Sequence, residues 1–170
     1  KAGNRPDRAV IVYANRAKEA YKDVPVIIGG IEASLRRLGH YDYWSDKVRR
    51  SILLDSKADL LIYGMGERGI AARDITWVRG TCYRAKDLSI AESAGEGNLR
   101  ILPSFDEISN DKRAYAQSFA TQFKNNDSIS AVTLAEKYTD TVYVVQNPPQ
   151  PPLEREELDD IYNLPFENEW

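Results

Sequence analysis

The segment VPVIIGG, residues 24–30, is an apolar run that ends in two glycines. Residues 7–21, which precede it, place apolar side chains at helical spacing. A helix, a tight turn, an apolar strand and a glycine pair in succession are typical of an α/β sheet. The same order recurs at ADLLIY, residues 58–63, followed by GMGER, residues 64–68. Two such units predict a mostly parallel sheet flanked by helices, of Rossmann-like or flavodoxin-like type.

The spacing after Arg68 does not fit a third parallel strand. We expect residues 75–78 to form a strand, and only about six residues separate it from Arg68, whereas a parallel crossover needs at least about 10–12. Either this strand is antiparallel to its neighbour, or further residues belong between Arg68 and Ile75. We favour the second alternative.

The other elements are expected to be less regular, and the chain turns acidic. Residues 40–44 are aromatic and too irregular for a strand, and Asp46 is expected to cap a following helix. Residues 91–98 are expected to form a loop. The remaining elements are expected as strands over 99–102 and 141–145 and helices over 106–123 and 154–161. Residues 1–147 then form an α/β domain, and residues 148–170 form a proline-rich linker with a short helix.

Composition excludes several classes of protein. The chain has 170 residues, which suits one domain, and no apolar run approaches the roughly 18–20 residues of a membrane span. Cys82 and His40 are the only residues of their types, so the chain holds no zinc site of its own. Residues 1–85 carry 16 basic and 10 acidic side chains, without the arginine-rich run that marks nucleic-acid binding. We expect a soluble, cytoplasmic protein.

The two glycine turns are the first candidate site. Gly29 and Gly30 follow the first strand, with Glu32 in the next turn of chain, and the second strand is followed by Gly64, Gly66, Glu67 and Arg68. Ligands of α/β sheets bind outside the carboxyl ends of the strands, where glycine lets a bound group approach the backbone. The turns therefore form either a cofactor-binding or docking edge, or merely tight strand-to-helix connections.

His40 is the second candidate. It lies among aromatic residues with Asp42 nearby, so it could belong to an acid–base pair or to a structured loop that covers the core. No Ser/His/Asp arrangement is present, and Cys82 has no visible activating neighbour. We therefore assign no catalytic residue and no metal ligand.

Three motifs closely resemble the N-terminal region of the YgiQ-like radical SAM proteins. They are GGIEASLRR at residues 29–37, YDYW at 41–44 and YGMGER at 63–68. Shorter matches at residues 147–149 and 162–166 extend the resemblance through nearly the whole chain. Members of this family usually have a helix after the GER element, which agrees with further residues after Arg68.

The resemblance implies a longer enzyme. Its core would carry a CxxxCxxC motif that holds a [4Fe–4S] cluster and binds S-adenosylmethionine, and this core is expected after Trp170, as a partner in the same polypeptide. None of those cysteines lies in this chain, which we therefore predict to be inactive alone.

The resemblance also implies an α/β module like a cobalamin-binding domain, with both glycine turns at the cofactor edge. The DxHxxG motif that supplies a histidine ligand to cobalt is absent, since His40 stands in GHY. The alternatives are a cobalamin- or nucleotide-binding module and a structural docking domain without a ligand.

Overall fold

The computed structural model of the protein describes residues 6–64, 66, 77–94 and 98–164. The hypothesis of further residues between Arg68 and Ile75 therefore lies outside the described residues, as does the start of the strand expected over 75–78.

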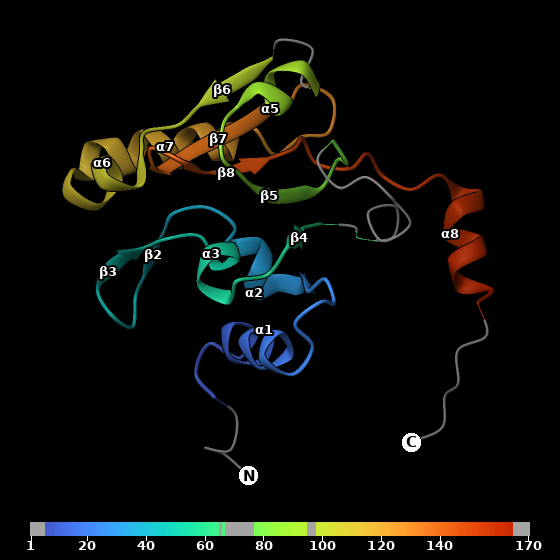
Figure 1. Ribbon diagram of the computed structural model, residues 1–170. Coiled ribbons are helices and arrows are strands. Elements are labelled where there is room, and N and C mark those ends of the chain that lie inside the picture. The colour runs from blue at the N-terminus through green and yellow to red at the C-terminus, as the bar shows by residue number, and fades with distance from the viewer. Residues whose placement is uncertain (1–5, 65, 67–76, 95–97, 165–170) are drawn as a thin grey trace.

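A six-stranded sheet forms the centre of the described part of the chain (Figure 1). In spatial order its strands are β1 (Ile27–Ile28), β4 (Leu60–Ile62), β5 (Thr81–Ala85), β8 (Val142–Gln146), β7 (Thr133–Thr139) and β6 (Leu99–Ile101). The β1–β4 and β6–β7 pairs are parallel. The β4–β5, β5–β8 and β8–β7 pairs are antiparallel.

In each parallel pair, two helices connect the first strand to the second along the chain. Helices α2 (Gly30–Leu35) and α3 (Ile52–Ser56) connect β1 to β4, and α6 (Phe105–Asn110) and α7 (Lys112–Lys124) connect β6 to β7. The prediction of an α/β sheet flanked by helices is confirmed. The share of parallel pairs is smaller than expected because β5 runs antiparallel to β4 and needs no crossover helix between them.

Successive side chains of the central strands face two separate apolar cores, one on each side of the sheet. Leu61 of β4 faces the first core, where helix α1 (Ala9–Ala20), α2 and α3 supply Ala14, Ala33 and Ile52. Leu60 and its neighbours face the second core, which helix α5 (Ser89–Ala94) covers with Ala91. Because successive side chains of a strand point to opposite faces, both faces of the central strands are buried.

The segment between α2 and α3 differs from the expectation. It forms an antiparallel hairpin of β2 (His40–Asp42) and β3 (Lys47–Arg49) rather than an irregular loop. Asp46 lies in the hairpin turn with φ of 51°, so the expected helix cap at Asp46 is wrong. Helix α3 begins later because the Ser51 hydroxyl accepts a hydrogen bond from the Leu53 N–H at 3.2 Å.

Three further elements differ from the sequence-based prediction. The long helix expected over 106–123 is two helices, because Asp111 ends α6 and its carboxylate caps α7 at the Arg113 N–H. Strand β7 was not predicted. Helix α5 occupies part of the expected loop 91–98.

The proline-rich segment begins against the sheet. The Gly80 N–H donates to the Pro148 carbonyl at 2.7 Å, and the side-chain amide of Gln150 donates to the Arg79 carbonyl at 2.6 Å. Helix α8 (Arg155–Tyr162) then lies to the side of the sheet in Figure 1. Within the described ranges, no helix is both long and apolar enough to cross a membrane.

Candidate functional site

Four of the predicted glycines meet in one cleft. Gly29 and Gly30 follow β1, and Gly64 and Gly66 follow β4, the parallel neighbour of β1. Together with side chains of β1 and β4 they line a cavity of about 490 Å³, which we call the glycine cleft. The cleft lies at the carboxyl ends of two parallel strands, the place where α/β sheets bind ligands.

The backbone of the glycine cleft explains why glycine occupies these positions. Gly30 and Gly64 have φ of 78° and 71°, which side chains rarely adopt, and a Cβ at either position would meet nothing within 4 Å. A Cβ on Gly29 would lie 3.3 Å from the Ile62 carbonyl oxygen. Gly29 therefore permits the close approach of the two strands, whereas Gly30 and Gly64 leave open space at the cleft.

The described residues of the glycine cleft offer groups for binding only. Its described lining residues, three isoleucines and four glycines, carry no ionisable side chain. Such a surface offers backbone polar groups and apolar contact to whatever enters it, and no general acid or base. Glu67 and Arg68, which were predicted for the same edge, lie outside the described residues.

Glu32 belongs to a different, charged pocket. Its carboxylate accepts a hydrogen bond from Arg36 at 3.0 Å, one turn along α2. The pocket has a volume of about 390 Å³ and is lined by Asp7, Arg8, Glu32, Arg36, Asp42 and Trp44.

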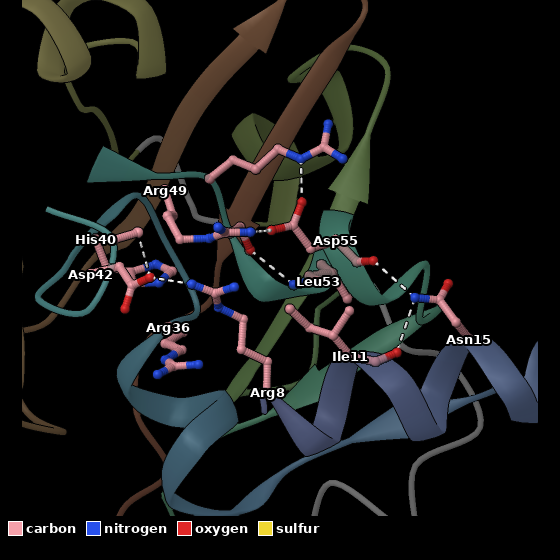
Figure 2. Close-up of polar contacts among 12 residues, drawn as sticks. Arg8, Ile11, Asn15, Arg36, His40, Asp42, Arg49, Leu53 and Asp55 are labelled. Atoms are coloured by element: carbon pink, nitrogen blue, oxygen red, sulfur yellow. Dashed lines mark hydrogen bonds and ion pairs between the residues drawn. The ribbon is translucent and has the colours of Figure 1, made fainter. Parts of the chain in front are cut away.

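Asp42 is the buried centre of this charged pocket. Figure 2 shows Arg8 extending from the start of α1 to the Asp42 carboxylate, to which the Ser45 hydroxyl also donates at 2.7 Å. The hydrogen bond from Ser45, which has the larger effect, and the one from Arg8 lower the pKa of Asp42 to about 2. Both guanidinium groups of the pocket thus have carboxylate partners. The Arg8–Asp42 pair fastens the start of α1 to the β2–β3 hairpin, whereas the Arg36–Glu32 pair runs along α2.

His40 does not form the hypothesised pair with Asp42. Its Nδ1 lies 3.2 Å from the Leu38 carbonyl oxygen, while the Asp42 carboxylate is engaged by Arg8 and Ser45. Burial lowers the pKa of His40, which favours the neutral ring. The structure therefore supports the structured-segment alternative for His40, which lies in β2 and away from the glycine cleft.

A buried carboxyl group was missed from the sequence. Glu136 of β7 is fully buried, and its Oε1 accepts hydrogen bonds from the Gly39 N–H at 2.8 Å and from the Tyr138 hydroxyl. The same hydroxyl accepts from the Ser51 N–H at 2.9 Å. Burial, opposed by these two donors, raises the pKa of Glu136 to about 7.

The described residues do not fit an iron–sulfur cluster or another metal. No three His, Cys, Asp or Glu side chains among them gather closely enough to bind a metal ion. Cys82 is buried in the first core, and burial raises the pKa of its thiol to about 12, which disfavours the thiolate that a cluster requires. Cobalamin with a histidine ligand is not supported either, since His40 lies away from the glycine cleft.

The class of protein follows from comparison with known families. The chain matches the family described as radical SAM N-terminal over residues 1–170, and it belongs to this family. The resemblance of the glycine-turn motifs to YgiQ-like proteins is thereby confirmed.

Particular relatives carry the name UPF0313 protein. One from Clostridium botulinum (strain ATCC 19397 / Type A) is 54% identical over 177 residues, covering 98% of this chain and 26% of the relative. UPF0313 protein CPE1196 from Clostridium perfringens (strain 13 / Type A) is 49% identical over 176 residues, covering 97% of this chain and 26% of the relative. The chain thus spans about a quarter of the length of these relatives. No solved structure matches the chain.

Proposed function

We propose that the full-length protein is a cytoplasmic radical SAM iron–sulfur enzyme, and that this domain positions or covers its catalytic core. The observation that carries the proposal is the family match over the whole chain, combined with relatives about four times as long. The [4Fe–4S] cluster and S-adenosylmethionine then belong to the remaining polypeptide, since the described residues offer no ligand set for a cluster. Residues 148–170 lead from the α/β domain toward that core.

The contribution of this chain is a shaped surface. The glycine cleft at the carboxyl ends of β1 and β4 receives a part of the core or of its substrate against exposed backbone. Because its described lining residues carry no ionisable side chain, the cleft binds and orients, and the chemistry takes place elsewhere.

The first experiment compares the full-length protein with the chain of residues 1–170 under anaerobic conditions. Iron and sulfide are measured after reconstitution, and 5′-deoxyadenosine is measured after addition of S-adenosylmethionine and a reductant. We expect about four irons per full-length protein and formation of 5′-deoxyadenosine, and neither with residues 1–170. Absence of a cluster from the full-length protein would contradict the proposal.

The second experiment tests the glycine cleft in the full-length protein. Gly30→Val adds a branched side chain to the open cleft and strains a backbone with φ of 78°. Gly30→Ala is the matched control, because it introduces the same kind of backbone strain with a single methyl group. We expect Gly30→Val to lower 5′-deoxyadenosine formation at least tenfold relative to Gly30→Ala at similar melting temperature. Equal activities would show that Gly30 serves only the turn.

A further inference from the structure

Helix α2 exposes its large apolar side chains. Ile31 and Leu35, one turn apart, are 80% and 72% exposed. Glu32 and Arg36 of the same helix have side chains that are only 29% and 26% exposed. A helix that packed only on its own domain would show the opposite pattern, with aliphatic side chains inside and charges outside.

Helix α7 shows the same inversion. Phe119 and Phe123 are 59% and 70% exposed, whereas Ser118 is buried. Leu35 of α2 and both phenylalanines line one open pocket of about 310 Å³, together with Tyr41 and Tyr115. Leu35 of α2, strand β2 and α7 thus line one groove with apolar and aromatic side chains beside the polar side chains of Arg37, His40, Gln122 and Asn126, and we call it the α2–α7 groove.

A cation without a carboxylate lies in this groove. Arg37, which lines the same pocket, donates from Nε to the Gln146 side-chain oxygen at 2.7 Å and from Nη1 to the Ser34 carbonyl at 2.6 Å. Its guanidinium also lies over the Tyr63 ring, 4.9 Å from the centroid. Its Nη2 donates to the Asn126 side-chain oxygen at 3.4 Å. The acceptors of this half-buried guanidinium are thus neutral, and no acidic side chain in the described part of the chain forms an ion pair with it, so its positive charge can still attract an anion.

We infer that the α2–α7 groove is the docking site for a segment of the remaining polypeptide, an apolar segment that carries an Asp or Glu to pair with Arg37. Exposed apolar side chains in one contiguous groove mark an interaction surface. The polar side chains of Gln122 and Asn126 also line the groove, so it combines apolar contact with hydrogen-bonding groups, as protein interfaces do.

The occupant follows from the length of the relatives and from covalent linkage. The chain covers 26% of those relatives, so about three quarters of such a polypeptide lies outside it. A covalently linked partner has a high effective concentration and reaches the groove ahead of free proteins. This inference shares with the proposed function only the premise that the polypeptide continues into a further domain.

The test is photo-crosslinking in the full-length protein. Phe123 is replaced by p-benzoylphenylalanine, the protein is irradiated at low concentration, and crosslinked peptides are identified by mass spectrometry. We expect a crosslink within one chain, from position 123 to an apolar segment outside residues 1–170 that contains an acidic residue. Tyr21, exposed at the end of α1, receives the same replacement as a control and should not reach that segment.

Two other outcomes would overturn the inference. Crosslinks between two chains, seen as a doubled mass on a denaturing gel, would assign the groove to a second copy. Products that contain no second peptide would show a free surface. Neither outcome bears on whether the full-length protein holds a cluster, so failure here is distinguishable from failure of the proposed function.

A second measurement tests the contact without disturbing the domain. Phe119→Ser combined with Phe123→Ser changes exposed positions only, so hydrogen exchange in β4 and β8 should be unchanged. We expect exchange in the docked segment to accelerate at least tenfold in this variant. Arg37→Gln should also accelerate it, and Arg37→Lys should do so less because the charge is retained. Unchanged exchange in the phenylalanine variant would contradict the docking.

Discussion

Replacing Glu136 by Gln should remove a large pH dependence of stability. The carboxyl has a folded pKa of about 7 because it is buried, against an ordinary value of 4.5. The folded state therefore holds this proton more tightly than the unfolded state, and stability falls as pH rises from 4.5 to 7. One pKa unit corresponds to about 1.4 kcal/mol, so the free energy of unfolding should fall by about 3 kcal/mol across this range.

The hydrogen bonds at Glu136 make Gln a suitable replacement. Its amide oxygen can accept from Gly39 and Tyr138 as Oε1 does now, and no charge can form. His40 titrates with the opposite sign, because a lowered pKa adds stability as pH rises. Since both proteins contain His40, the difference between them reports Glu136 alone.

The assay is urea unfolding of residues 1–170, monitored by far-ultraviolet circular dichroism, at intervals from pH 4.5 to 7.5. The free energy of unfolding of the wild type minus that of Glu136→Gln should decrease by about 3 kcal/mol over this range. Glu92→Gln, at an exposed position of α5, is the control and should run parallel to the wild type. A constant difference between wild type and Glu136→Gln would refute a buried, proton-holding carboxyl.

Three further predictions concern the same chain. Gly39→Ala should lower the free energy of unfolding by about 1–3 kcal/mol in urea titrations, because its Cβ would overlap the Ile108 side chain and press on the Glu136 carboxylate. Asp42 has a pKa of about 2 because of hydrogen bonds made only in the folded state, so its protonation destabilises the wild type between about pH 4 and pH 2. Asp42→Asn should therefore lose less stability than the wild type over this range, as measured by circular dichroism. Anaerobic iron–sulfide reconstitution of residues 1–170 should leave it colourless, since Cys82 is one thiol where a cluster needs three or four; stoichiometric absorbance near 400 nm would contradict this.

The strand-to-glycine turns could be predicted because they depend on a local sequence pattern. An apolar strand followed by glycine requires only neighbouring residues to be recognised, and the structure places Gly29, Gly30, Gly64 and Gly66 in one cleft. The parallel pairing of their strands was predicted from the recurrence of the same strand, glycine turn and helix unit, and the structure confirms it. The antiparallel pairing of β5 with β4 is harder to predict, because the sequence pattern places the third strand at residues 75–78 whereas β5 begins at Thr81.

Long-range partners explain what the sequence did not reveal. In the sequence, Glu136 has no feature that marks it as buried. Its burial depends on a hydrogen bond from the Gly39 N–H, which lies 97 positions earlier in the chain. Phe119 and Phe123 of α7 recur at helical spacing, and such spacing alone does not show whether they face the core or the solvent. Only the placement of the sheet shows that they point away from it.

Strand β8 governs when this domain can fold during its synthesis. It lies between β5 and β7 and therefore joins β1, β4 and β5 to β7 and β6. Residues 142–146 are also the last strand of the described sheet to emerge from the ribosome. Until then the nascent chain exposes the unpaired edge of β5, to which chaperones or neighbouring nascent chains can add a strand. Slow translation just before residue 142 would prolong that exposure, whereas slow translation well after residue 146 would give the completed sheet time to close.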